Sequence, residues 1–528
     1  MIAPVHKPLH PALKLVNSSL LAKLGELPFD AIAQHPYPLP GADYLTIQSM
    51  SPHTAIVGST GSGKTVLLKH LMSSVLPAPV QEGSLRFRAV IYDPKRELYP
   101  FLEGLGISKQ QIIVTHPFDS RSASWNLARD FVEPAQIEEL AEMIVPKSDS
   151  KSSAPGNEFF ESTSRIIFQD ITESLRILRP NNWELRDIVE SVSSLPRLKT
   201  ILSRTSEGKD SWNAYLSPLE RDRQDRTALS IHASLMTYAR PFRSLAALWN
   251  NAEREFSLEQ WHTSSGILLL GADPSRNRTM QRVNQLLMKR VSQLALSRNE
   301  ERPVDLTWFF LDEVREAGKL EGLRRLMTEG RSKGIRVVLG FQDIEGLYDL
   351  YGEHEAEEMI GLCANRIVLH LDTPKTRKWA SEFFGQAEVV QPSKGYSDTT
   401  GISASSSDST QWGVGLKDNM LPIEFHNLPL GSLNEGIDFF YAVPGRRNRF
   451  HFSSDLFQKA ITHETRSNSK AFLKRPASHQ KLGKWTKPEL ESLGLRKKQQ
   501  PAQKKKTPET DTTEKATSKK EIKTGLLF

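Results

Sequence analysis

Short apolar runs alternate with longer amphipathic stretches along the first 130 residues and again after residue 265. The strand-like runs end in Gly, Pro or acidic residues and occupy 54–57, 88–93, 111–117, 266–272, 306–313, 335–342 and 366–372. A helix is expected from Thr65, where VLLKHLM places apolar residues on one face. This alternation predicts an α/β fold with a mainly parallel sheet.

Three other stretches have different patterns. From Gln136 to Trp249 few strand-like runs occur, which predicts an all-α insertion with a surface loop at 149–156. Residues 393–412 are rich in Ser, Thr and Gly, so a mobile loop is expected there. Residues 499–523 have low complexity and few apolar positions, which predicts disorder.

Composition narrows the class of protein. The chain has 528 residues, 38% hydrophobic and 25% charged, enough for roughly two to four globular domains. Its single cysteine, Cys363, excludes an intramolecular disulfide and favours a reducing cytoplasm. No apolar run approaches the ~20 residues that cross a bilayer, and the proline-rich N-terminus is unlike a secretory signal. A soluble, cytoplasmic protein is expected.

The formal net charge of +7 is unevenly distributed. Residues 461–528 contain 17 of the 69 Lys and Arg and 7 of the 62 Asp and Glu, a balance of +10. The remaining 460 residues therefore carry a net charge of −3. Net charge alone does not indicate that the body binds nucleic acid; a tail such as KKK at 504–506 is either a phosphate-backbone binder or a solubilising segment.

The most specific motif is GSTGSGKT, which lies between a predicted strand and a predicted helix. It fits the G-x-x-x-x-G-K-[ST] phosphate loop, whose backbone N–H groups converge on a polyphosphate. The predicted nucleotide-binding residues are Gly58, Ser59, Thr60, Gly61, Ser62, Gly63, Lys64 and Thr65. Lys64 is expected to neutralise phosphate charge and Thr65 to ligate Mg²⁺, which makes ATP and Mg²⁺ the expected cofactors.

An acidic pair follows a buried strand in LTWFFLDE. Asp312 is expected to hold Mg²⁺ through water, and Glu313 to polarise the attacking water as general base. Further on, Gln342 ends a strand and is a candidate γ-phosphate sensor. Arg331 precedes the same strand and is a candidate arginine finger acting in trans; a surface arginine and a capping glutamine are the alternatives.

These motifs, in this order, resemble the TraD-like coupling proteins of conjugative type IV secretion, within the FtsK/HerA branch of P-loop translocases. The resemblance includes VIYDPKRELYPFL at 90–102, NEFFESTSRIIF at 157–168 and the segment 309–352. It favours the finger and sensor roles of Arg331 and Gln342. It also implies a RecA-like ring hexamer with DNA in a central pore. The chain departs from the family in having no N-terminal transmembrane helices before the phosphate loop and in carrying Arg96 where many relatives have glycine.

The expected organisation is an N-terminal arm (1–45), a nucleotide-binding domain in two parts (46–135 and 251–460), an all-α inserted domain (136–250) and a basic, disordered tail (461–528). The expected function is ATP-driven DNA translocation that delivers a relaxase–DNA complex to a type IV secretion channel. The resemblance places such a protein in the cytoplasm, or peripherally at the inner membrane through its partners.

Two other functions are compatible with the sequence. One is a HerA/FtsK-type DNA motor in DNA processing or defence, and the other is a non-catalytic scaffold that docks substrates. Intact Lys64 and Glu313 weigh against the scaffold. His53, His70 and His116 lack metal-ligand spacing and are expected in the core or on the surface rather than in a metal site.

Overall fold

The computed structural model describes residues 36–38, 44–46, 53–76, 87–146, 157–298, 306–399, 405–443 and 446–496. The chain divides into two compact units, Met1–Lys484 and Trp485–Phe528. Within its described residues the second unit contains the short helix α22 (Lys487–Ser492). All that follows concerns the first unit.

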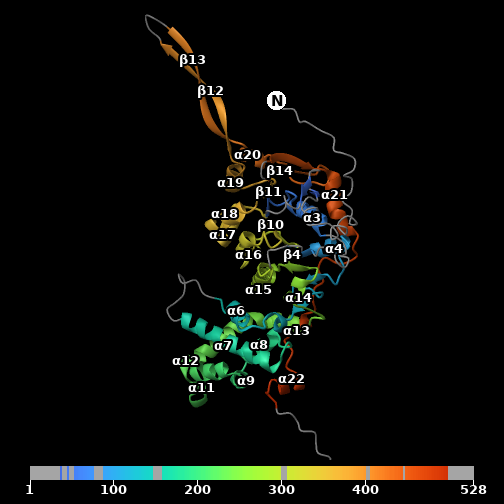
Figure 1. Ribbon diagram of the computed structural model, residues 1–528, viewed down its shortest axis with the longest axis vertical. Helices are drawn as coiled ribbons and strands as arrows, with labels where there is room; N and C mark the ends of the chain where they lie inside the picture. Colours follow the sequence, from blue (N-terminus) through green and yellow to red (C-terminus); the bar gives the residue numbers. More distant parts are fainter. Residues whose placement is uncertain are drawn as a thin grey trace, which may run out of the picture. The chain divides into compact units, whose positions relative to one another are not determined.

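A nine-stranded sheet organises the first unit, with strand order β15-β14-β11-β3-β10-β9-β4-β8-β5. Figure 1 labels four of its strands, β14, β11, β10 and β4. The seven strands from β11 to β5 are parallel, and β14 and β15 extend one edge in antiparallel pairing. The strands are β3 (Thr54–Val57), β4 (Phe87–Asp93), β5 (Ile112–Val114), β8 (Gly266–Gly271), β9 (Leu306–Leu311), β10 (Ile335–Phe341), β11 (Asn365–Val368), β14 (Ile437–Val443) and β15 (Arg446–Phe452). The predicted parallel α/β sheet is therefore confirmed, and each of the seven predicted strands lies in it.

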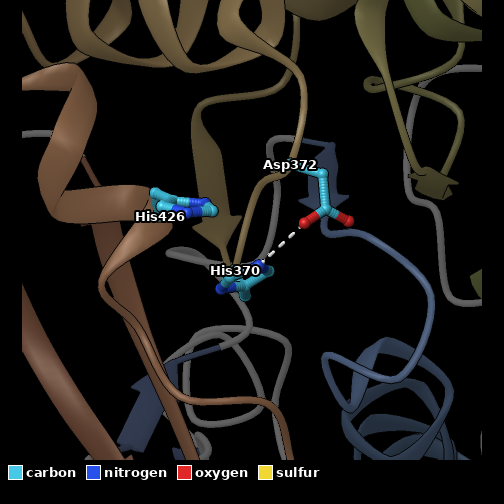
Figure 2. A group of neighbouring side chains, drawn as sticks. All are labelled: His370, Asp372 and His426. Atoms are coloured by element: carbon cyan, nitrogen blue, oxygen red, sulfur yellow. Dashed lines mark hydrogen bonds and ion pairs between the residues drawn. The ribbon is translucent and has the colours of Figure 1, made fainter.

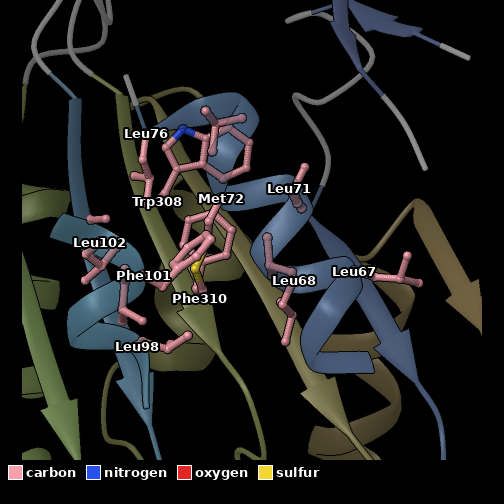
Figure 3. Close-up of a cluster of buried hydrophobic side chains, with 14 of the residues drawn as sticks. Leu67, Leu68, Leu71, Met72, Leu76, Leu98, Phe101, Leu102, Trp308 and Phe310 are labelled. Carbon is pink, nitrogen blue, oxygen red and sulfur yellow. The ribbon is translucent and has the colours of Figure 1, made fainter. Parts of the chain in front are cut away.

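Helices on one face of the sheet build its main core. Helices α3 (Lys64–Val75) and α4 (Leu98–Gly104) place leucines against aromatic side chains of β9 (Figure 3). Phe310 is fully buried in this cluster, together with Leu68 and Phe101. Truncating one such leucine to alanine typically costs about 2–5 kcal/mol, so this packing fixes where α3 begins relative to the sheet. The loop before α3 is thereby fixed at the carboxyl end of β3.

Other helices follow the strands in the usual alternation. Helix α15 (Asn277–Leu296) contacts β8, and α16 (Leu323–Glu329) and α17 (Ile344–Tyr351) contact β10. Helices α14 (Leu258–Thr263), α18 (Glu353–Gly361), α19 (Pro374–Phe384), α20 (Pro422–His426) and α21 (Ser454–Thr465) complete this part. Two three-residue strands, β1 (Pro36–Pro38) and β2 (Tyr44–Thr46), pair with each other. The first lies in the predicted N-terminal arm and the second crosses its predicted end at residue 45, while the arm's other residues lie outside the described part.

In the stretch predicted to be helical, 136–249, all regular elements among the described residues are helices and none is a strand. They are α6 (Pro134–Ile144), α7 (Asn157–Leu178), α8 (Leu185–Ser191), α9 (Leu195–Leu202), α10 (Ser206–Ser211), the π-helical turn Trp212–Leu216, α11 (Pro218–Arg221), α12 (Arg226–Ala239), the 3₁₀ turn Arg240–Phe242 and α13 (Arg243–Asn250). The predicted loop at 149–156 lies outside the described residues.

The segment that enters this helical stretch and the segment that leaves it are held together by a strand pair and by the hydrogen bonds of Asp130. Strands β6 (Ala123–Trp125) and β7 (Arg254–Phe256) pair in parallel, and α5 (Leu127–Asp130) follows β6. The fully buried carboxylate of Asp130 accepts bonds from Ser257 Oγ at 2.6 Å and from the backbone N–H of Leu258 at 2.6 Å. Asp130 thus binds the start of α14 to the segment that enters the insertion.

The predicted mobile loop at 393–412 is wrong for 393–399 and 405–412, whereas residues 400–404 lie outside the described part of the chain. Strands β12 (Gln386–Thr399) and β13 (Ser405–Asp418) form a long antiparallel hairpin with continuous register (Figure 1). At the described end of β13 the side chains of both faces are exposed, Val414 and Leu416 on one face and Lys417 on the other, so this two-stranded ribbon buries little of either face. Without a buried face the sequence needs no apolar–polar alternation, which is why the pattern did not indicate strands.

The predicted disordered tail from residue 461 is wrong for 461–496, which the structure describes. Helix α21 ends at Thr465 and packs on α3 and α4. The chain then runs on as a segment, 466–484, in which Lys474 forms a β-bridge with Asp119 and Arg475 is only 3% exposed. The compact unit ends at Lys484 rather than at residue 460. The low-complexity stretch 499–523 lies outside the described residues.

Among the described helices, none combines the length and the hydropathy that a membrane-spanning segment requires.

Candidate functional site

The phosphate loop connects β3 to α3 at the carboxyl edge of the parallel sheet. Its conformation needs glycine at Gly63, whose φ is +97° and whose missing Cβ would lie 2.5 Å from Ile437 Cδ1. Ser59 fixes the other end of the loop, because both its N–H and its Oγ donate to the carbonyl oxygen of His370 at 2.9 Å. The loop is therefore preformed between the sheet and the first turn of α3.

A cavity of about 310 Å³ opens above this loop. It is lined by Ser59, Thr60, Gly61, Gly63, Lys64, Thr65, Val66, Lys95, Glu313, Gln342, Gly431 and Phe457. Six of the eight residues predicted to bind nucleotide line it, and so do three of the four predicted catalytic residues, Lys64, Glu313 and Gln342. The remaining two loop residues, Gly58 and Ser62, lie beneath the loop surface, where Ser62 is 1% exposed.

Asp312 and Thr65 meet at the base of the cavity. The Thr65 hydroxyl donates to Asp312 Oδ2 at 2.9 Å, although the two residues come from α3 and from the end of β9. Asp312 Oδ1 is buried and has no hydrogen-bond partner in the described part of the chain. Gly340 on β10 makes room for this carboxylate, since a Cβ there would lie 3.2 Å from Oδ1. A buried carboxylate oxygen without a donor, beside a hydroxyl, suits Mg²⁺, which prefers oxygen ligands.

Lys64 and Glu313 form an ion pair across the cavity floor. Lys64 Nζ also lies 3.6 Å from Asp312 Oδ1. Burial lowers the pKa of Lys64 to about 8, against the raising effect of Asp312, and nearby Lys95 lowers it further. The ammonium group is thus held in a poorly hydrated site, where an additional anion stabilises its charged form.

Glu313 adopts a left-handed backbone conformation, with φ of +55°. A non-glycine residue in this region is uncommon and carries a conformational cost of order 1–3 kcal/mol. The turn after β9 thereby directs the Glu313 side chain back to the phosphate loop, where Lys64 binds it. Strain of this kind is typical of functional positions.

Gln342 and Arg331 lie at opposite ends of β10. Gln342 Oε1 accepts a bond from the Thr60 hydroxyl at 3.1 Å, so this residue reaches the phosphate loop. Arg331 is exposed before the first residue of β10, and seven strand residues separate it from the cavity edge. At ~3.3 Å per residue this span is about 20 Å or more, so Arg331 does not reach the cavity of its own subunit.

The structure adds Lys95, which is exposed and lines the cavity. Its loop is held by Asp93, whose carboxylate accepts the N–H groups of Glu97 at 3.2 Å and Leu98 at 2.8 Å. Burial raises the pKa of Asp93 to about 6. The sequence DPKRE at 93–97, part of the family-like segment 90–102, indicates this loop, but spacing alone does not indicate which of its residues faces the cavity.

Arg96 explains the departure from glycine in the same loop. Its φ is +59°, a conformation that glycine adopts without cost, and its guanidinium lies over the Phe472 ring, 4.7 Å from the centroid. The cation–π contact offsets part of the strain. Of the three histidines expected in the core or on the surface, His53 and His116 are buried and His70 is partly buried. Desolvation lowers the pKa of His53 and of His70 to about 4.

Three comparisons relate this chain to known proteins. A family model described as type IV secretion-system coupling protein DNA-binding domain matches residues 39–430. Coupling protein TraD of Escherichia coli (strain K12) is 24% identical over 350 residues, which is 64% of this chain and 44% of that protein. The chain thus spans less than half the length of this curated relative.

Solved structures of the bacterial conjugative coupling protein TrwB have the same fold. An unbound form of TrwBdeltaN70 superposes with a TM-score of 0.60 at 20% identity, covering 87% of this chain and 95% of that one. The complex of TrwB with a non-hydrolysable ATP analogue gives 0.61 at 20% identity, covering 86% and 95%. The complex with ADP and Mg²⁺ gives 0.58 at 19%, covering 86% and 94%.

Proposed function

Because this chain belongs to the family of type IV secretion-system coupling proteins, through their DNA-binding domain, we propose that it hydrolyses ATP and uses the energy to move DNA during conjugative transfer. The similar TrwB fold has been solved with an ATP analogue and with ADP and Mg²⁺, which supports the choice of nucleotide and metal. The coupling role named for TraD and TrwB supports conjugation over a motor for DNA processing or defence.

One observation carries the catalytic part of the proposal. Lys64, Thr65, Asp312 and Glu313 come from two segments almost 250 residues apart, yet their functional atoms meet at one cavity floor. A docking scaffold needs neither this convergence nor the strained backbone at Glu313. The arrangement is that of a hydrolase for nucleoside triphosphates.

In the proposed hydrolysis of ATP each of these residues has a separate role. Lys64 leaves its ion pair with Glu313 and pairs with the terminal phosphates, which frees the carboxylate. Glu313 then accepts a proton from the water that attacks the γ-phosphorus, and Gln342 orients that water beside Thr60. Thr65 and Asp312 would hold Mg²⁺, which would neutralise part of the phosphate charge.

We infer that Arg331 completes the site of a neighbouring subunit. Its position at the far end of β10 excludes a role in its own cavity and fits a finger that crosses a subunit boundary. A homo-hexameric ring provides such boundaries, with one nucleotide at each and DNA in the centre. The proposal for Arg331 therefore depends on assembly.

We also infer the domain roles and partners. The nucleotide would be bound by the domain formed of residues 46–135 and 251–460, whereas the all-α domain at 136–250 lies outside that site. The relaxase–DNA complex and components of the secretion channel are the proposed partners. In this proposal the protein works in the cytoplasm, at the inner membrane when the channel recruits it.

The test is ATPase activity of the purified protein with no DNA, single-stranded DNA and double-stranded DNA. The proposal requires hydrolysis that depends on Mg²⁺ and rises with one form of DNA. Arg325→Ala, a change at an exposed arginine of α16, serves as a control with wild-type activity. Absence of hydrolysis in all conditions, from folded and nucleotide-bound protein, would support the scaffold.

A further inference from the structure

Two histidines and an aspartate gather beside the phosphate loop without being part of the nucleotide cavity. His370 and Asp372 follow β11, and His426 is the last residue of α20 (Figure 2). One ring nitrogen from each histidine and one carboxylate oxygen all lie within 4.8 Å of one another. The 55 residues between His370 and His426 include strands β12 and β13, so the fold alone brings the three side chains together.

The hydrogen bonds of His370 fix which nitrogen carries its proton. Nδ1 lies 2.7 Å from the carbonyl oxygen of Leu428, and a carbonyl oxygen only accepts, so Nδ1 carries a hydrogen. Nε2 lies 3.0 Å from Asp372 Oδ1. In a neutral imidazole Nε2 then presents a lone pair to a carboxylate, which is repulsive. A positive charge, either a proton or a metal ion, is required between these two atoms.

His426 distinguishes these two possibilities. Its ring lies 5.3 Å from that of His370, centroid to centroid, and no hydrogen bond to either of its ring nitrogens is present among the described residues. In an imidazolium–carboxylate ion pair a second imidazole at this distance has no role. With a metal ion, the second imidazole would be a further ligand. A ring N–H bonded to a backbone carbonyl is also the usual support of a metal-ligating histidine.

We propose that His370 Nε2, Asp372 and His426 bind a divalent transition-metal ion of the Zn²⁺ class. Two imidazoles and one carboxylate, with a fourth position open to water, are a recognised Zn²⁺ ligand set. Ligand atoms ~2.0–2.2 Å from a tetrahedral ion lie about 3.3 Å apart, so small side-chain rotations close the present spacing. His426 and Asp372 are exposed and free to make them, while His370 is held by Leu428.

The site has a direct connection to the phosphate loop. The His370 carbonyl oxygen accepts both the N–H and the hydroxyl of Ser59, as described above. A metal ion that fixes the end of β11 to α20 therefore also restrains the first turn of the loop. The metal is expected to stabilise this edge of the sheet whether or not the protein hydrolyses ATP, so the inference does not rest on the proposed function.

The test is metal binding by the full chain, without an affinity tag and without nucleotide. Zn²⁺ is measured by isothermal titration, and Co²⁺ by its visible absorption, which reports tetrahedral coordination. We expect one tight equivalent per chain in the wild type. His426→Ala and Asp372→Asn should each lower that affinity by more than the roughly 10–100-fold that loss of a supporting residue costs.

A matched control lies on the edge strands. His451 Nδ1 lies 3.0 Å from Asp438 Oδ1, a second histidine–aspartate pair without a third metal ligand in the described structure. His451→Ala should therefore leave Zn²⁺ affinity and the Co²⁺ spectrum unchanged. The same spectra from wild type and His426→Ala, or no tight equivalent in the wild type, would overturn the proposal and leave a protonated His370.

Thermal unfolding provides the second measurement, because a ligand that binds only the native state stabilises it by RT ln(1 + c/Kd), with c the free ligand concentration, and so raises the midpoint as that concentration rises. Zn²⁺ should raise the unfolding midpoint of the wild type and of His451→Ala, and chelation should reverse the rise. His426→Ala is a change at an exposed residue and should fold normally but show no rise. An equal rise in that variant would assign Zn²⁺ to other residues and refute the site.

Discussion

Nucleotide affinity should fall steeply above pH 8, because the ammonium group of Lys64 is the positive charge beneath the phosphates. Burial lowers its pKa to about 8 in the empty site. Bound phosphate raises that pKa again, so binding above pH 8 requires uptake of a proton and weakens as pH rises. With a pKa of about 8, roughly three quarters of the protein is protonated at pH 7.5 and about 3% at pH 9.5. The expected loss of affinity is about 25-fold, or about 1.9 kcal/mol.

The assay is titration of ADP with Mg²⁺ at pH 7.5, 8.5 and 9.5, since a phosphate with a second pKa near 6 is already ionised over this range. Repeating the titration in buffers of different ionisation enthalpy measures the proton uptake directly. Lys64→Arg is the control, because guanidinium does not titrate here and its affinity should be nearly constant with pH. A flat wild-type profile, or the same slope in Lys64→Arg, would refute the reasoning.

Three further outcomes are expected. Glu313→Gln should keep nucleotide bound but lower turnover by ~10²-fold or more, measured as single-turnover hydrolysis; unchanged turnover would remove the general base. Arg331→Ala should abolish DNA-stimulated hydrolysis without loss of nucleotide affinity, and mixing it with Lys64→Ala should restore part of the rate; no recovery in co-assembled rings would exclude action in trans. Deletion of 497–528, which carries nine lysines and four acidic residues, should weaken DNA binding at low salt and flatten the slope of log affinity against log salt while basal hydrolysis persists. An unchanged slope would instead favour a role for this segment in protein binding or solubility.

The parallel strands and the nucleotide site were predictable for the same physical reason. A strand buried on both faces is a continuous apolar run, and its polar functional residues gather after its last residue, as Asp312 does after β9. The phosphate loop has a conformational requirement for glycine that leaves a readable motif. Gln342 also follows its strand directly, so its place beside Thr60 follows from the parallel order of β3 and β10.

Features that depend on contacts distant in sequence left no such signal. The antiparallel edge strands β14 and β15 were not predicted at all, and the β12–β13 hairpin was interpreted as a loop. The cluster of His370, Asp372 and His426 spans an insertion of unpredictable path, so its residues showed no ligand spacing. Lys95 faces the cavity because Asp93 folds the following turn, a local bond that a motif does not reveal.

The segment 466–484 shows why the net charge of +10 in residues 461–528 overstates the positive charge available for DNA binding. Its arginines and lysines were counted with a solvated tail, yet Arg475 is buried and donates to the carbonyl oxygens of Leu248 at 2.5 Å and Ser122 at 3.0 Å. Leu248 belongs to α13 of the insertion, whereas Ser122 precedes β6, so one guanidinium joins two parts of the unit. Burial lowers the pKa of Arg475, because removing the guanidinium from water disfavours its charged form. The two hydrogen bonds to carbonyl oxygens offset part of this desolvation cost. A positive charge used in this way is not available to DNA. Electrostatic attraction of DNA by the C-terminal region must therefore come from charges other than Arg475. A deletion that starts at 461 would remove both those charges and the contacts of Arg475 that stabilise the first unit, so its effect on DNA binding could not be assigned to charge alone.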